Sequence, residues 1–180
     1  VMALKMNSLG ISLPFGIGSI SIDVDESQQK AAWSLYVELA TRVASVELEP
    51  GMGSAREALN SLYSIFGTTR SVLRESGPGA AKGPHSVGPI AIRILNEGLR
   101  PFLVKWHSRL SEFETTQTEG QRNAFGGKVT VVIDESRWAD LDEFYKDLSE
   151  LRDSMLAYVD ALARIAGVHH ESSAARGDTN

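Results

Sequence analysis

The sequence predicts a mostly α protein, an antiparallel four-helix bundle with a small β-element from the N-terminal arm and residues 128–133. Three observations predict this fold. Apolar residues recur at the three- and four-residue spacing of a buried helix face along four long segments. Clusters of glycine and proline separate these segments. The last segment carries a heptad pattern, which is typical of a helix packed almost parallel or antiparallel to a neighbour.

The chain divides into an arm, a helical domain and a tail. Residues 1–25 are predicted to form an N-terminal arm with short strands, because apolar and polar residues alternate along much of it. Residues 26–167 form the predicted helical bundle domain, which includes a loop at 114–127 and a short β-branched strand at 128–133. Residues 168–180 are polar and are predicted to be disordered.

The first two helices have clear boundaries. The first helix begins after the capping residue Asp25, buries a face that includes Trp33, and ends before Pro50. The second begins with a capping box, in which Ser54 and Glu57 can each bond the other's free backbone N–H. Glycine and proline at positions 77 and 78 end this helix.

The third helix contains a proline. It begins near Ser86, and Pro101 removes a backbone hydrogen bond and clashes with the carbonyl group of Glu97. We therefore predict a bend or break between Gly98 and Pro101. The polar, glycine-containing segment 114–127 that follows predicts a long loop.

The last helix is predicted from about Ser136 to Ala166, with an a/d heptad pattern of apolar residues. This pattern is longer than a short neighbouring helix covers, so we predict a homodimer or a stable complex through Met155 and Leu162. Trp138 precedes the pattern and is predicted to be half exposed and available to a partner. The pattern consists of Leu141, Phe144, Leu148, Leu151, Met155, Tyr158, Leu162 and Ile165.

Two similar stretches, IDVDES at 22–27 and VVIDES at 131–136, each lead into a helix. Their strands are predicted to pair as a small ribbon, which would bring several carboxylates together. Converging carboxylate oxygens suit Mg²⁺ or Ca²⁺, whereas capping of two helix N-termini explains the same residues without any pairing. Capping is the preferred interpretation, and no metal is predicted. The carboxylates are Asp23, Asp25, Glu26, Asp134 and Glu135.

Composition excludes several classes of protein. The 180 residues include no cysteine, which excludes disulfides, thiolate metal sites and cysteine nucleophiles and favours the cytoplasm. A net charge of −5 disfavours a nucleic-acid partner, because such partners are held by neutralising phosphates. No stretch approaches the roughly 20 apolar residues of a membrane-spanning helix. The glycine-rich stretch 77–83 lacks the Lys-Ser/Thr ending of a phosphate-binding loop, and no cofactor is predicted.

The stretch RPFLVKWH holds the strongest candidate for chemistry. Arg100 and His107 are seven positions apart, close to two helical turns, so their side chains point the same way. One interpretation is a catalytic pair. The other, which we prefer, is that both flank the apolar stripe around Trp106 and cover it with the carbon atoms of their side chains.

The spacing of Arg100 and His107 resembles the Arg-(four to six residues)-His signature of the HEPN superfamily. These are helical bundles of about this size, and many are metal-independent RNases of bacterial conflict systems. The resemblance implies that His107 would move protons at a 2′-hydroxyl group and that Arg100 would hold the scissile phosphate. Pro101 stands where the family usually has a polar residue.

Three longer stretches, AAWSLYVELATRVA, LNEGLRPFLVKWH and LRDSMLAYVDALARIAGV, resemble bacterial helical-bundle proteins of defence or signalling loci. That resemblance implies no activity and no functional residue. We therefore predict a non-enzymatic interaction module, or an accessory subunit of a bacterial multi-protein complex, with a defence locus as one setting. The partner would be another protein or a second copy of the chain. The alternatives are a HEPN-like RNase, and a small-ligand or metal sensor where the strands meet the helix N-termini.

Overall fold

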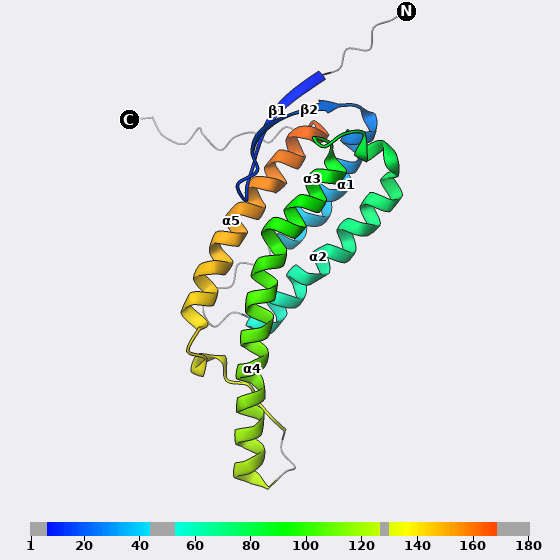
Figure 1. The fold of residues 1–180 in the computed structure, drawn as a ribbon. Helices are drawn as coiled ribbons and strands as arrows, with labels where there is room; N and C mark the ends of the chain where they lie inside the picture. The colour runs from blue at the N-terminus through cyan, green and yellow to red at the C-terminus, as the bar shows by residue number, and fades with distance from the viewer. Residues whose placement is uncertain (1–6, 44–52, 127–129, 169–180) are drawn as a thin grey trace, which may run out of the picture.

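The computed structural model describes residues 7–43, 53–126 and 130–168 of the chain and is mostly helical, with one two-stranded antiparallel sheet. The long helices lie alongside one another, and α4 projects beyond α2 and α5 at one end (Figure 1). The elements are β1 (Asn7–Leu13), β2 (Gly18–Val24), α1 (Glu26–Val43), α2 (Ala55–Ser76), η2 (Pro78–Ala81), α3 (Val87–Arg93), η3 (Ile94–Leu99), α4 (Arg100–Phe125), η4 (Glu135–Arg137) and α5 (Leu141–Ala166).

The arm forms a β-hairpin. Strands β1 and β2 pair antiparallel with Ile11 opposite Ile20, and a turn at residues 14–17 joins them. Phe15 has a φ of 60°, an uncommon conformation for a residue with a side chain. The inward face of the hairpin buries Ile11 and Ile22, and β1 contacts α5. The alternating pattern of the arm therefore reflects a sheet with one buried face.

The predicted ribbon between the two similar stretches is wrong. The paired neighbour of β2 is β1, which follows from the short turn that joins them. Residues 130–133 form no strand, and residues 128–129 of the predicted strand 128–133 lie outside the described part of the chain. Residues 130–134 instead form an extended segment that lies along the projecting end of α4.

The predicted starts of the first two helices are confirmed. The Asp25 carboxylate accepts a hydrogen bond from the Gln28 N–H at 2.9 Å at the start of α1. At the start of α2, the Ser54 hydroxyl accepts from the Glu57 N–H at 3.1 Å, and the Glu57 carboxylate accepts from the Ser54 N–H at 3.4 Å. Gly77, with a φ of 65°, ends α2. The predicted end of the first helix at position 50 lies outside the described residues.

The face of α1 that packs inward differs from the predicted one. Trp33 is 50% exposed, whereas Ala32, Leu35 and Leu39 are buried. Apolar residues occur on more than one side of this helix, so its periodicity alone does not identify the buried face. The predicted side carries large aromatic rings that remain partly in solvent.

The third helix passes through Pro101 without a break. Helix α3 continues into the π-helical segment η3 and then into α4, so the helical run is unbroken from position 87 to 125. In this segment the Arg100 N–H donates to the Leu95 carbonyl, five residues back. A π turn takes one extra residue and drops a bond from the α pattern, so a proline without N–H fits beside it. The predicted break is therefore wrong.

The loop predicted at 114–127 is also wrong, because α4 remains helical to Phe125. Its threonine hydroxyls bond carbonyls four residues back, as Thr115 does to Ser111 at 2.8 Å. Gly126, with a φ of 74°, ends the helix. The segment lacks an apolar stripe because it projects beyond the other helices and has no core to face.

Helix α5 buries most of its heptad pattern inside this chain. It begins at Leu141, later than predicted, because η4 precedes it. From Phe144 to Ile165 all seven pattern residues are buried, and α5 packs against α1. Met155 and Leu162 are each 1% exposed. Neighbouring elements of the same chain thus cover the apolar face for which the sequence suggested an external partner.

Trp138 lies in an aromatic cluster of the core rather than half exposed. It is 6% exposed, stacks on Phe113 at 5.9 Å between ring centroids, and meets Trp106 edge to face at 5.6 Å. Phe144 completes the cluster.

Across the described ranges, none of the helices combines the length and apolar character needed to cross a bilayer.

Candidate functional site

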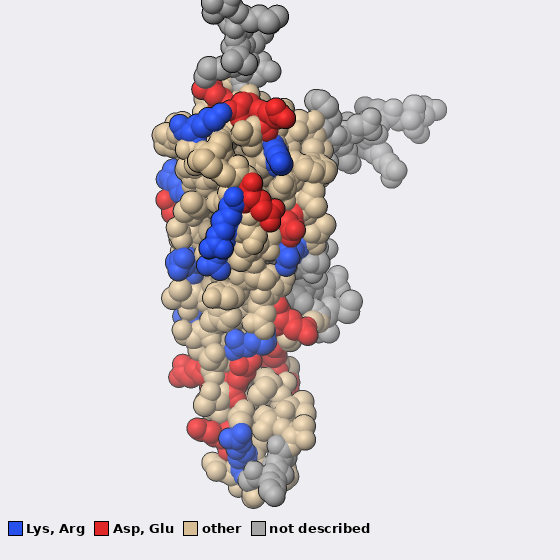
Figure 2. All heavy atoms as spheres, turned by 90° about the vertical axis from the view of Figure 1, so that its right-hand side faces the viewer, with Lys and Arg blue, Asp and Glu red and all other residues tan. Residues whose placement is uncertain are grey.

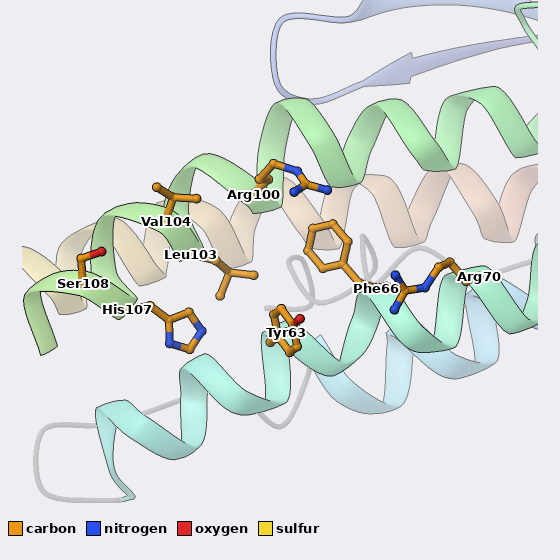
Figure 3. Close-up of a pocket in the computed structure, with 8 residues that line it drawn as sticks. All are labelled: Tyr63, Phe66, Arg70, Arg100, Leu103, Val104, His107 and Ser108. Carbon is orange, nitrogen blue, oxygen red and sulfur yellow. The ribbon is translucent and has the colours of Figure 1, made fainter. Parts of the chain in front are cut away.

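A surface hollow of about 370 Å³ lies between α2 and α4, and we call it the α2–α4 groove (Figure 3). Residues from the two helices face each other across it. Helix α2 contributes Tyr63, Phe66 and Arg70, and α4 contributes Arg100, Leu103, Val104, His107 and Ser108.

Helical spacing brings these side chains together. Tyr63, Phe66 and Arg70 follow one another at three and four residues, so they share one face of α2. Arg100 and His107 share one face of α4 for the same reason. Both therefore line the same groove, as their spacing predicts.

The groove carries two arginines that no carboxylate of the described residues neutralises. Arg70 and Arg100 are exposed, and neither forms an ion pair with a described residue. The Arg100 guanidinium lies 5.2 Å from the centre of the Phe66 ring, and its Nε donates to the Asn96 amide oxygen at 3.1 Å. None of the described residues that line the groove is acidic. An anion in the groove would therefore meet two open guanidinium forks.

Two other basic residues of α4, Lys105 and Arg109, differ because carboxylates already hold them. Lys105 contacts Glu143 at 2.7 Å and Asp147 at 2.6 Å. Arg109 contacts Glu143 at 3.2 Å. The hydrogen bonds that the Lys105 ammonium donates to Asp147 and, secondarily, to Glu143 raise the pKa of Lys105. These pairs link α4 to α5, on a different side of α4 from the groove.

His107 is half buried at one end of the groove and is held by Arg56. An Arg56 Nη lies 3.3 Å from His107 Nδ1, and the Glu114 carboxylate binds the same guanidinium at 2.5 and 3.1 Å. Burial, and secondarily the charge of Arg56, lowers the pKa of His107. A guanidinium can only donate, so Nδ1 accepts and the neutral ring carries its proton on Nε2. At neutral pH His107 therefore presents an N–H donor.

The rest of the groove is apolar but open. Tyr63 is 63% exposed and Val104 is 66% exposed. The Tyr63 ring meets the His107 ring edge to face, with centroids 6.2 Å apart. The arrangement combines cations with an exposed apolar surface. Such a surface suits a ligand that carries both negative charge and apolar groups.

Met155, Leu162 and Trp138 do not contribute to any site on the surface. All three were predicted to contact a partner, and all three are buried in the core of this chain. The apolar pattern that suggested them is real, but the chain's own helices cover it. Association of the chain remains a prediction and requires another surface.

The acidic residues at the helix starts act as caps. Asp25 caps α1 and binds Lys82 at 2.5 Å, and these contacts lower the pKa of Asp25, Lys82 contributing most. The Glu135 carboxylate accepts from the Ala55 N–H, at 2.9 and 3.0 Å to its two oxygens, at the start of α2. Asp134 caps η4. Within the residues described, no three His, Asp or Glu side chains are placed to hold a metal ion.

Sequence reasoning missed the contribution of α2. Tyr63, Phe66 and Arg70 belong to no recognisable motif in the sequence. They matter only because α2 packs beside α4. A cation on each of two helices becomes a site when the helices are neighbours, and a single sequence does not show which helices are neighbours.

Comparisons with known proteins leave the chain without a family assignment: no family model matches it, and neither curated proteins nor solved structures give a significant match.

Proposed function

We propose that this chain is a non-enzymatic interaction module whose α2–α4 groove binds an acidic segment of a partner protein. The observation that carries the proposal is the pair Arg70 and Arg100, which no carboxylate of the described residues neutralises and which flank an exposed apolar surface. Arginine forks bind carboxylates through paired hydrogen bonds, and Tyr63 and Val104 offer contacts to a neighbouring apolar side chain.

The fold and setting of this module are part of the proposal. We interpret the long helices as an antiparallel four-helix bundle, which the packing of α1 on α2 and α5 and of α4 on α2 supports. The lack of cysteine supports a cytoplasmic location. A role as accessory subunit of a bacterial, defence-related complex rests on the resemblance of the helix sequences alone.

A protein partner fits the charge pattern better than a nucleic acid. The chain carries a net charge of −5, and Figure 2 shows basic and acidic side chains interspersed on one face rather than gathered into a basic field. Two open guanidinium groups can neutralise few phosphates, whereas nucleic-acid affinity rises with the number neutralised. A short segment with two or three carboxylates matches the charge of the groove.

The test is a titration of the full chain with the labelled, C-terminally amidated peptide Glu-Phe-Glu, followed by fluorescence anisotropy. We expect saturable binding that Arg70→Ala and Arg100→Ala each weaken about tenfold, because a hydrogen bond to a charged group contributes about 1.5–3 kcal/mol. Arg122→Ala is the matched control, since Arg122 is exposed on α4 outside the groove. Equal losses in all three variants, or no saturation, would refute the groove as the binding site.

A HEPN-like RNase remains the second candidate, because Arg100 and His107 line one groove as that mechanism requires. The contact from Arg56 opposes it, since Nδ1 already accepts a hydrogen bond and Nε2 carries the proton. The neutral ring therefore lacks a free nitrogen to take a proton from a 2′-hydroxyl group.

RNA cleavage by the purified chain distinguishes this candidate from the binding module. We expect no cleavage above background, and no difference between the unmodified chain and His107→Ala. Cleavage that is lost in a His107→Ala variant with an unchanged melting temperature would instead establish the nuclease.

A further inference from the structure

Two glutamines on the projecting end of α4 hold an extended segment of the chain. The Gln117 amide donates to the Asp134 carbonyl at 3.0 Å and accepts from the Asp134 N–H at 3.0 Å. The Gln121 amide donates to the Val132 carbonyl at 2.8 Å and accepts from the Val132 N–H at 3.3 Å. Each side-chain amide thus makes the two bonds that a residue of a neighbouring strand makes in an antiparallel sheet.

This arrangement leaves the opposite edge of the segment open. In an extended chain, the backbone groups of successive residues point to alternate edges. The backbone N–H and C=O groups of Val132 and Asp134 point towards α4. Those of Val131 and Ile133 therefore point away from it. In the part of the chain that the structure describes, nothing bonds the N–H or C=O of these two residues. The segment therefore presents an unpaired strand edge.

The open edge lacks the usual protection against pairing. Residues 130–133 contain no charge and no proline, and three of the four are Val or Ile. Val132 is 69% exposed, and Phe125 at the end of α4 is 72% exposed. An uncharged, β-branched edge of this kind is a template for another strand.

We propose that residues 130–134 pair antiparallel with the same segment of a second copy of the chain, about a two-fold axis at Val132. In this register Val131 of each copy lies opposite Ile133 of the other. The outward N–H and C=O groups of both residues then bond each other in both copies. Val132 faces its own counterpart as a non-hydrogen-bonded pair, which brings two exposed valines into contact.

A second copy fits this edge for reasons of register and charge. The two-fold axis places Asp134 opposite Thr130, so like charges do not meet and the Thr130 hydroxyl can donate to the carboxylate. One isologous contact satisfies the open groups of both chains at once. The edge runs along the end of α4 that projects past α2 and α5, which leaves room for the rest of each copy (Figure 1). The contact is independent of the α2–α4 groove.

The absence of cysteine from the sequence makes a cross-linking test specific. In the full chain, Val132→Cys should form a disulfide-linked dimer under a glutathione redox buffer, because paired Cα atoms at a non-hydrogen-bonded position lie about 4.5 Å apart, within disulfide range. Thr130→Cys is the control, since in this register it faces Asp134 rather than its own counterpart. Equal or faster linkage of Thr130→Cys would overturn the register.

Sedimentation equilibrium of the cysteine-free chain tests the pairing itself. We expect a dimer whose dissociation constant rises at least tenfold in Val132→Lys, which opposes two charges at the axis, and in Ile133→Pro, which removes an outward N–H. Ile92→Lys is the matched control, because Ile92 is 52% exposed on α3 and should leave the dimer unchanged. A monomer at all concentrations, or a dimer equally stable in all variants, would overturn the proposal.

Discussion

At the scale of single residues, the environment of His107 makes the stability of the fold depend on pH. The pKa of His107 is lowered in the folded chain by burial and by the charge of Arg56. The imidazolium form is therefore less favourable in the folded state than in the unfolded state. A histidine of this kind contributes stability above its unfolded pKa of about 6.5, and this contribution is lost as the pH falls through the lowered folded pKa.

We predict that His107→Gln reduces the loss of stability between pH 7.5 and pH 5. Glutamine can still accept a hydrogen bond from Arg56 but does not titrate in this range. Urea denaturation of both proteins at the two pH values measures the difference. Equal losses of stability in the two proteins on acidification would show that the pKa of His107 is not lowered in the folded chain.

Replacing Trp106 by alanine should destabilise the protein much more than replacing Arg100, which lies six positions earlier. Trp106 is fully buried, and its indole N–H donates to Asp147 at 3.2 Å. Trp106→Ala should cost about 3–5 kcal/mol because it leaves a cavity. Arg100→Ala should cost at most about 1 kcal/mol, because the side chain is exposed. Chemical denaturation checks both values, and a larger cost for Arg100→Ala would place this arginine in the structural core.

At the scale of elements, the π-helical segment η3 couples the third helix to the hairpin. A Cβ atom built on Gly98 would lie 2.5 Å from the Phe15 ring, which belongs to the hairpin turn. The ring therefore occupies the space that only a glycine leaves free. Glycine at this position is required by the close approach of the hairpin to the helix.

We predict that Gly98→Ala destabilises the protein by about 1–3 kcal/mol, the usual cost of overpacking. Gly120→Ala is the matched control, because a Cβ at this helical glycine meets nothing within 4 Å and should stabilise α4 by up to about 1 kcal/mol. In a Phe15→Ala background the cost of Gly98→Ala should fall. Thermal denaturation of Gly98→Ala, Gly120→Ala, Phe15→Ala and the double variant at positions 15 and 98 measures these changes in stability. Equal effects at the two glycines would exclude the contact with Phe15.

The extended segment beside α4 should show alternating hydrogen exchange. The N–H groups of Val132 and Asp134 are bonded to glutamine side chains, whereas those of Val131 and Ile133 point away. We predict slower exchange at 132 and 134 than at 131 and 133 in dilute protein, measured by NMR. Gln117→Ala should remove the protection of Asp134 and leave that of Val132. Uniform exchange along the segment would show that the glutamine contacts do not persist in solution.

At the scale of the whole molecule, the predicted mostly helical chain with a small β-element is confirmed, and several boundaries of its elements follow from local chemistry. The capping box of Ser54 and Glu57 involves residues three positions apart, so the sequence alone shows it. The end of α5 at Gly167 and the placement of Arg100 and His107 on one face of α4 also follow from short-range spacing. Neighbouring residues contain the whole interaction in each of these cases.

The tertiary structure decided which surfaces are covered. The apolar face around Met155 and Leu162 looked available for a partner, yet the packing of α5 with the rest of the chain buries it. The polar segment 114–125 looked like a loop, yet it is helical and holds an extended segment through Gln117 and Gln121. Arg70 joined the candidate site only because α2 lies beside α4. Spacing along the chain determines the face that a helix presents, whereas burial and the convergence of distant charges depend on which helix lies opposite.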